Sequence, residues 1–302
     1  MDLNDSILSE LELVDNSLSM FNPVSSVSAV NSSLTFRPDE YLTEAIGIAK
    51  KAHQLSYGAF DPTVAPLVNL WGFGTSEAEG TTEPSDSDVA RALRLVGIDR
   101  CEINSEGVLL KTHPLTRFDF SGVAKGYGVD RVAKMLARNG CEDFKVEIGG
   151  ELVVSGLNSR RQPWHIMVEA PNYTPGSSER LCMREFGPEV TSIASSGNYR
   201  NYRTDSLGHR YGHTISPRTG HPVQSDVLGS TIVLPGYECA LADALATAAM
   251  VLGSDSTIIM VQKAGASAII VAGVNETKLM TLDISPDSVK RSYFSPEIGE
   301  KR

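Results

Sequence analysis

The chain has 302 residues, of which 41% are hydrophobic and 21% are charged, and its 27 basic and 37 acidic residues give a formal net charge of −10. This acidic balance excludes proteins that coat nucleic-acid phosphates with a dense basic face, so we expect no nucleic-acid partner. No apolar run approaches the roughly 18 to 20 residues of a membrane span, and the opening MDLNDSILSE lacks the basic and apolar regions of a signal peptide.

The first quarter of the chain is predicted to consist of helices and loops. Apolar residues recur on one face from Asn4 to Leu18, which indicates an amphipathic helix followed by a polar loop over 19–31. A second helix is expected from about Pro38 to Leu55, with proline near its first turn. The apolar but Gly- and Pro-rich segment 58–74 reads as a packed loop around a short helix. The acidic segment of about 75–88 has no periodicity and is predicted to be a flexible surface loop.

Short strands and one clear helix are expected in the middle of the chain. After a helix near 88–96, strands are predicted around Cys101–Ile103 and Val108–Lys111. The sequence RFDF at 117–120 indicates a strand, and residues 123–140 indicate a helix that stops at a glycine. The sequence FKVEIGGELVVSG at 144–156 indicates two strands joined across a double glycine.

Strands dominate the C-terminal half, interrupted by two helices. Strands are predicted at 164–170, 190–197, 211–217 and 229–235, helices at 239–253 and 257–265, a closing hairpin at 267–273 and 278–284, and a frayed polar tail from 285 to 302. Strands grouped with strands, and helices grouped between them, predict an α+β fold with largely antiparallel sheet. We expect one domain over 1–302; a distant duplication into two related halves stays open, although no repeat is measurable.

The first candidate site is the sequence DFSGVAKGYGVDR at 119–131. The expected strand ends in Asp119 and turns through Ser121 and Gly122 into a helix, whose free amides attract phosphate while glycine lets it approach the backbone. Lys125, one turn into the helix, can reach the same anion. The spacing matches neither the P-loop nor the dinucleotide fingerprint, and a plain turn capped by Ser121, with Lys125 on the surface, is the alternative.

The second candidate site is on the apolar helix expected at 239–253. Asp243 and Thr247 are four residues apart, so they share one face. A buried carboxylate is costly without compensation, so Asp243 needs a cation or several hydrogen-bond donors as partners. A hard cation such as Mg²⁺, held by a carboxylate, a hydroxyl and backbone carbonyls, meets that need. The alternative is that Asp243 caps the helix start and Thr247 bonds back to its own helix.

Two further segments carry weaker signals. His213 precedes the turn SPRTG, and because histidine side chains ordinarily titrate near neutral pH, His213 is a candidate general base; a satisfied structural histidine is the alternative. In the segment 58–72, an Asp-Pro-Thr turn between Phe60 and Trp71 suits either a site that encloses a flat aromatic ligand or a well-packed loop.

Seven motifs follow one another between Leu18 and Gly253: LSMFNPVSSVSAVN, GAFDPTVAPLVNLWGFG, DFSGVAKGYGVDRVAKML, VEIGGELVVSG, SSGNYRNY, HTISPRTGHPV and LADALATAAMVLG. In order and content they resemble the FAD:protein FMN transferases of the ApbE family. The resemblance implies a T-fold-like α+β architecture with an FAD site between its halves. It also implies a transferase that moves FMN from FAD to a Thr or Ser hydroxyl of an acceptor flavoprotein, depends on Mg²⁺ and releases AMP.

The resemblance further implies roles for individual residues. Contacts to FAD are implied for Phe21, Ala59, Phe60, Asp61, Asp119 and Lys125. The implied metal ligands are the backbone carbonyl of Gly122 and the side chains of Asp243 and Thr247. His213 is implied to be the base that activates the acceptor hydroxyl.

The chain also departs from the family pattern. Phe21 stands where tyrosine is usual, Ser121 where glycine is frequent, and Ser216 where an aspartate is common, so a hydroxyl contact to FAD and the role of a carboxylate do not carry over. The Gly-Thr-containing strand that usually precedes the first helix is not in this sequence. No D-G-x-T-G acceptor motif occurs either, so self-modification is not expected.

The family resemblance implies work in the bacterial cell envelope or periplasm, with membrane association only through a lipoprotein anchor outside this sequence. Two other activities stay open. One is a Mg²⁺-dependent FAD pyrophosphatase, in which water replaces the acceptor hydroxyl and the products are FMN and AMP. The other is a non-catalytic FAD-binding protein.

Overall fold

A seven-stranded sheet forms the centre of the computed structural model, which describes residues 2–74, 83–169, 180–197, 202–204, 210–275 and 278–294. Its strands are arranged in the order β14-β13-β12-β11-β8-β5-β4, and each pair of neighbours is antiparallel. In chain order they are β4 (Phe144–Ile148), β5 (Glu151–Ser155), β8 (Thr191–Gly197), β11 (Val227–Pro235), β12 (Ser267–Asn275), β13 (Lys278–Ser285) and β14 (Ser288–Phe294).

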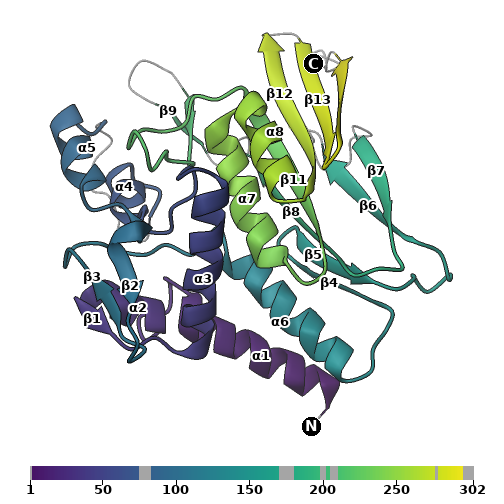
Figure 1. The fold of residues 1–302 in the computed structure, drawn as a ribbon, viewed down its shortest axis with the longest axis horizontal. Coiled ribbons are helices and arrows are strands. Elements are labelled where there is room, and N and C mark those ends of the chain that lie inside the picture. Colours follow the sequence, from purple (N-terminus) through teal and green to yellow (C-terminus); the bar gives the residue numbers. More distant parts are fainter. Residues whose placement is uncertain are drawn as a thin grey trace.

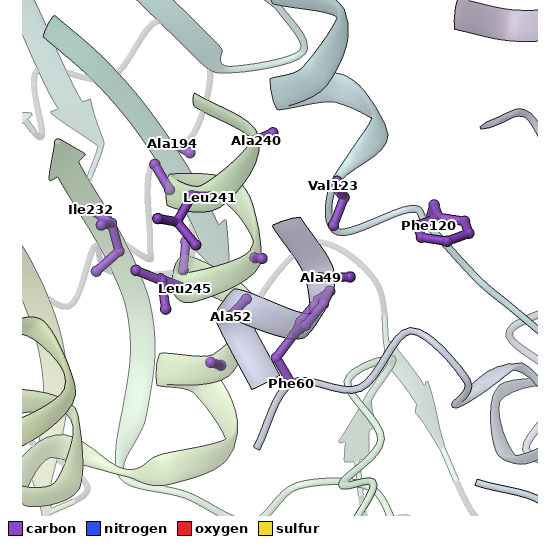
Figure 2. Close-up of a cluster of buried hydrophobic side chains, with 14 of the residues drawn as sticks. Ala49, Ala52, Phe60, Phe120, Val123, Ala194, Ile232, Ala240, Leu241 and Leu245 are labelled. Carbon is purple, nitrogen blue, oxygen red and sulfur yellow. The ribbon is translucent and has the colours of Figure 1, made fainter. Parts of the chain in front are cut away.

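Helices pack against this sheet around the almost wholly apolar helix α7 (Figure 1). The longer helices are α1 (Leu3–Leu18), α3 (Glu40–Leu55), α6 (Ala124–Arg138), α7 (Cys239–Leu252) and α8 (Ser254–Lys263). Leu241 and Leu245 of α7 face Ile232 of β11, as Figure 2 shows, and all three side chains are buried. Because α7 has the sheet on one side and α3 and α6 on the other, it needs no polar face to meet solvent.

The smaller elements surround this core. They are α2 (Ser26–Ser32), β1 (Thr35–Phe36), α4 (Ala65–Leu70), α5 (Asp86–Leu93), the 3-10 turn η1 (Ile98–Arg100), β2 (Cys101–Ile103), β3 (Leu109–Lys111), β6 (Trp164–Glu169), β7 (Arg180–Phe186), β9 (Tyr202–Thr204) and β10 (Arg210–Gly212). Strands β1, β3 and β2 form a small sheet in that order, while β6–β7 and β9–β10 are two-stranded ribbons. The predicted α+β class with antiparallel sheet is confirmed; the assignment of a single domain stays a prediction.

The expected polar loop at 19–31 is wrong in its second half, because α2 begins within it. Ser25 caps this helix by accepting a 3.1 Å hydrogen bond from the Ser28 amide, and Val27 and Val30 are buried. The two valines are three residues apart, so they lie on one face of the helix. A single short turn with many serines gives too little periodicity to stand out in the sequence.

The strand predicted at RFDF is also wrong. Only Arg117 makes an isolated bridge, with Val64. The next residue, Phe118, has its backbone groups satisfied by a side chain instead of a neighbouring strand, because Asn31 donates to its carbonyl over 2.9 Å and accepts from its amide over 2.6 Å. The amide of Asp119 donates to the Pro62 carbonyl over 2.6 Å. The segment is therefore a buried extended connection that leads into α6.

Two boundaries, one at a loop and one at the C-terminal end, differ from the predictions. The tail beyond Ser285 is not frayed at first, since β14 pairs with β13 from Ser285–Ser288 to Leu279–Phe294; residues 295–302 lie outside the described residues. Of the predicted flexible loop at 75–88, residues 75–82 lie outside the described residues, and α5 already begins at Asp86 with Ser85 as its cap.

The segment predicted as a strand at 211–217 is only partly one. Strand β10 ends at Gly212, and Ile215 makes a single bridge with Pro222. Ribbon strands β7 and β9 have no counterpart in the prediction, whereas the two hairpins β4–β5 and β12–β13 are confirmed. Across the part of the chain that the structure describes, no helix is both long and apolar enough to cross a membrane.

Candidate functional site

A cavity of about 1080 Å³ opens between the sheet, the start of α6, the middle of α7 and the loop before α4. All of the residues to which the family resemblance gives a role lie on its wall: Phe21, Ala59, Phe60, Asp61, Asp119, Gly122, Lys125, His213, Asp243 and Thr247. They come from segments more than 200 residues apart in the sequence. The fold therefore brings the four candidate segments together in one place. Trp71, which the sequence suggested could enclose a flat ligand together with Phe60, is not among the residues that line the cavity.

Asp243 is buried, with 2% of its surface exposed, in the second turn of α7. It does not cap the helix start, because that position is served by Asp130 of α6, whose two carboxylate oxygens accept hydrogen bonds of 2.9 Å from the amides of Cys239 and Ala240. Asp243 instead accepts a 3.3 Å hydrogen bond from the Gly126 amide. Burial raises the pKa of Asp243, against the opposing effects of Lys125 and that amide.

Thr247 lies one turn further along α7, on the same face as Asp243. Its hydroxyl is 3.4 Å from Ser196 Oγ on β8. The backbone of Gly122 adjoins it closely, since a Cβ on Gly122 would lie 3.1 Å from Thr247 Oγ1 and 3.1 Å from the ring of Phe60. Glycine at 122 therefore lets the turn before α6 approach the hydroxyl.

The residues around Asp243 fit a hard divalent cation. A buried carboxylate, a hydroxyl one turn away and the adjoining backbone at Gly122 are all oxygen donors, the set that Mg²⁺ prefers. Among the residues described, no three His, Cys, Asp or Glu side chains form a cluster that could hold a metal ion by themselves. Any metal held here by the protein therefore depends on hydroxyl and backbone oxygens as well as on Asp243.

Lys125 lies between two buried carboxylates. Its ammonium is 3.4 Å from Asp243 Oδ2 and 3.6 Å from Glu151 Oε1, and it also donates to the Ser121 carbonyl over 3.3 Å. Burial alone would lower the pKa of Lys125, but the two carboxylates outweigh it and raise that pKa. Lys125 is therefore a permanent positive charge on the cavity wall. Its side chain is 43% exposed, as the alternative of a surface lysine expects, but it is paired with two buried carboxylates.

Glu151 lines the cavity and was not singled out in the sequence. It is the first residue of β5, directly after the Gly149–Gly150 turn, whose φ angles of 63° and 104° favour glycine. Burial and the charge of Asp243 raise the pKa of Glu151 above its ordinary value, and the ammonium of Lys125 opposes that rise. A signal did exist, because Glu151 is the lone acidic residue in the apolar strand ELVVS, as Asp243 is in α7.

Two expected FAD contacts, Asp61 and Asp119, are buried carboxylates that also organise the backbone around them. Asp61 Oδ1 accepts from the amide and the hydroxyl of Thr63 over 2.8 and 2.6 Å, and its Oδ2 accepts from the Ile98 amide over 3.0 Å. Asp119 Oδ1 accepts from the Ser121 amide over 2.8 Å. The alternative in which the Ser121 side chain caps the helix is wrong, since α6 starts after Val123 without a side-chain cap.

The other three expected FAD contacts are apolar. Ala59 and Phe60 are buried, and the Phe60 amide donates to Ser56 Oγ over 3.0 Å. Phe21, in contrast, is 84% exposed at the cavity wall. This arrangement offers a fixed apolar surface on one part of the wall and a movable aromatic ring on another.

His213 follows β10 and is exposed on the cavity wall. Its ring lies edge-on to Phe73, with 6.4 Å between the ring centroids. The SPRTG turn beyond it is tied to the chain on both sides of α4. Trp71, directly after α4, donates to the Gly220 carbonyl over 2.8 Å, and Arg218 donates over 3.3 Å to the carbonyl of Ser56, directly after α3. These bonds anchor the segment that carries His213, and they occupy Arg218 in a structural role.

Comparison with known proteins gives one consistent result. The model of the ApbE family matches residues 2–270 of the chain. An FAD:protein FMN transferase of Vibrio cholerae serotype O1 is 38% identical over 248 residues, which cover 81% of this chain and 72% of that protein. One from Haemophilus influenzae is 36% identical over 254 residues, which cover 82% of this chain and 69% of that protein. The solved structure of the flavin transferase ApbE from Vibrio cholerae matches with a TM-score of 0.83 at 32% identity, covering 94% of this chain and 88% of that chain.

Proposed function

The chain belongs to the ApbE family, and we propose that it is an FAD:protein FMN transferase that moves FMN from FAD to a Thr or Ser hydroxyl of an acceptor flavoprotein, with Mg²⁺ bound and with AMP as the leaving group. The relatives that carry this name support the transferase and its flavin substrate. One observation on this chain carries the proposal furthest: the buried carboxylate of Asp243 lies on the same cavity wall as Thr247, Lys125 and His213.

The reaction divides into steps that need different groups. The acceptor oxygen forms a bond to the phosphorus on the FMN side of the FAD pyrophosphate, and the bond from that phosphorus to the bridging oxygen breaks, so that AMP leaves with the bridging oxygen. Negative charge on the phosphate oxygens must be neutralised while this happens. The ammonium of Lys125 supplies a permanent positive charge in the cavity for that purpose.

A proton must also leave the acceptor hydroxyl. We assign this to His213, because an imidazole can accept a proton near neutral pH and His213 lies on the wall beside the ring of Phe73. His165 also lies on the wall, but its Nε2 is 3.2 Å from Glu185 Oε1. Mg²⁺ held by Asp243, Thr247 and the backbone of Gly122 would add charge neutralisation on the pyrophosphate oxygens.

The dimensions and walls of the cavity suit a dinucleotide. Small-molecule pockets have volumes of roughly 300 to 1,000 Å³, and the cavity here, at about 1080 Å³, is slightly above that range. Phe60, Ala59 and Phe21 offer apolar and aromatic surface for a flat ring, and Asp61 and Asp119 offer acceptors for its polar edge or for a ribose. Because the cavity opens to solvent beside Phe21 and His213, a loop of a second protein can reach the same place.

The test is an incubation of the protein with FAD and Mg²⁺, with and without an acceptor flavoprotein. Covalent flavin is detected by fluorescence of the acceptor after denaturing electrophoresis, and AMP and free FMN by chromatography. The transferase predicts AMP in proportion to covalently bound FMN and little of either product without acceptor. Free FMN released at the same rate with or without acceptor would identify a pyrophosphatase instead, and absence of AMP under all conditions would identify a protein that only binds FAD.

A further inference from the structure

The ammonium of Lys125 lies close to two carboxylates, which differ in the other hydrogen bonds that they accept. Asp243 Oδ2, 3.4 Å from the ammonium, also accepts the hydrogen bond of the Gly126 amide. Glu151 Oε1, 3.6 Å from the ammonium, belongs to a strand on the other side of it. Both carboxylates have only 2% of their side-chain surface exposed, whereas 43% of Lys125 is exposed. The lysine is therefore the member of the trio that has room to move.

Glu151 has unused capacity to accept hydrogen bonds. Its Oε2 is buried and has no partner among the residues that the structure describes. A buried carboxylate oxygen without a donor is costly, so native proteins nearly always provide one. Lys125 is the cation beside Glu151, and its aliphatic chain adjoins the Gly149 turn, where a Cβ would lie 3.3 Å from Lys125 Cδ. A small shift of the ammonium away from Asp243 would give Oε2 a donor.

Binding of a divalent cation to Asp243 would demand such a shift. The ammonium and the cation are both positive and both attracted to the same carboxylate, so each disfavours the presence of the other. A dication on Asp243 repels the ammonium from Oδ2, and the ammonium then needs another acceptor. Glu151 is already within 3.6 Å of it and has a free oxygen.

We propose that Lys125 and Mg²⁺ compete for Asp243, and that Glu151 is the positioning residue that receives the Lys125 ammonium when Asp243 binds the metal. This inference rests on the proposed function only in that it takes Asp243 as a Mg²⁺ ligand. It gives Glu151 a role that acts through Lys125: it stabilises the metal-bound arrangement and keeps the ammonium on the cavity wall, where the phosphates of FAD must pass.

The inference is tested by measuring the affinity of the protein for Mg²⁺ alone, without FAD, by titration calorimetry after removal of metal with a chelator. Glu151→Gln should weaken Mg²⁺ binding by roughly 10-fold or more, the size of effect that partners of metal-ligating groups commonly have. Lys125→Met should strengthen it several-fold, because the competing cation is gone. Asp243→Ala should abolish binding, which shows that the titrated site is this one.

The double variant Lys125→Met/Glu151→Gln separates positioning from mere structural support. If Glu151 acts through the lysine, Gln at 151 has no further effect once Met is at 125, and the double variant binds Mg²⁺ as tightly as Lys125→Met does. The matched control is Glu238→Gln, which removes an exposed carboxylate 3.5 Å from Lys51, away from the cavity; it should leave Mg²⁺ affinity unchanged.

Each remaining outcome has a definite meaning. Lys125→Met with unchanged or weaker Mg²⁺ affinity overturns the competition, and an equal loss from Glu151→Gln in both backgrounds overturns the role through Lys125. Either result leaves the metal site itself intact. Absence of Mg²⁺ binding to the parent protein, or binding that survives Asp243→Ala, instead contradicts the metal part of the proposed function and removes the inference with it.

Discussion

The Gly126 amide donates a 3.3 Å hydrogen bond to Asp243 Oδ2, and so joins the first turn of α6 to the second turn of α7. The two helices approach so closely that a Cβ on Gly126 would lie 2.4 Å from the Cys239 carbonyl oxygen and 2.8 Å from Ala240 Cα. The absence of a side chain at 126 is therefore a condition for placing the buried carboxylate beside Lys125.

A first prediction concerns this contact. Gly126→Ala should destabilise the protein by about 1 to 3 kcal/mol, because the clash is with backbone atoms that cannot rotate away, and it should weaken Mg²⁺ binding by moving α6 from Asp243. The matched control is Gly47→Ala in α3, where a Cβ meets nothing within 4 Å; there alanine should stabilise by roughly 0.5 to 1 kcal/mol. Urea unfolding of both variants measures the difference, and a Gly126→Ala protein as stable as the parent would contradict this account of the helix contact.

A second prediction concerns the carboxylate itself. Asp243→Ala should reduce FMN transfer to background while the protein stays folded, because burial disfavours the charged carboxylate and alanine suits the interior of a helix. Lys125 is partly exposed and can turn to water when its partner is removed. Transfer to an acceptor and the thermal unfolding midpoint are measured together, with the exposed Asp255→Ala in α8 as a control. Turnover near the parent rate would show that Asp243 is not a metal ligand.

A third prediction follows from the cap of α7. Burial raises the pKa of Asp130 to about 6, against the lowering effect of the Ala240 and Cys239 amides, whereas the ordinary value is 3.8. The folded state therefore binds the proton more tightly than the unfolded state. The stability that this group contributes is fully present below pH 3.8 and is lost as the pH rises through about 6.

The comparison that isolates this effect is with Asp130→Asn, which cannot titrate. The free energy of unfolding of the parent minus that of the variant should fall by about 2 to 3 kcal/mol between pH 4 and pH 7. Urea unfolding at a series of pH values measures it. A difference that stays constant, or that grows with pH, would mean that the pKa of Asp130 is not raised in the folded protein.

The sequence predicts those parts of the fold whose pattern is local. Helix α7 is an apolar run, interrupted by Asp243 and Thr247, that ends at Gly253, and the two strands of hairpin β4–β5 are separated by a double glycine. Both elements could therefore be identified without the structure. The RFDF segment misleads because its alternating apolar residues do point into the core, but the partner of its backbone is the side chain of Asn31, 87 residues away. No local pattern contains that information.

The residues of the candidate site also differ in how far the local sequence could identify them. Asp243 could be identified because one charge interrupts an apolar helix, whereas Asp130 lies in an amphipathic helix with many charged residues, and its role depends on the distant start of α7. Glu151 carried the same signal as Asp243, within a strand too short for it to be noticed. Its importance depends on Lys125, which the fold brings within 3.6 Å of it.

The last prediction concerns His213. If it is the base that takes the proton of the acceptor hydroxyl, His213→Ala should lower the rate of FMN transfer by roughly 10² to 10⁴ at saturating FAD. The affinity for FAD should hardly change, because His213 is exposed on the cavity wall and the apolar surface comes from other residues.

The control is His221→Ala, which removes a histidine from the same turn. His221 packs on Trp71, with 5.7 Å between the ring centroids, and is not on the cavity wall, so its loss should leave the transfer rate nearly unchanged. Single-turnover transfer and flavin fluorescence titration separate rate from binding. Loss of FAD binding in His213→Ala with a normal rate at saturation would make His213 a contact to the substrate, and the proton would then have to leave by another group on the wall.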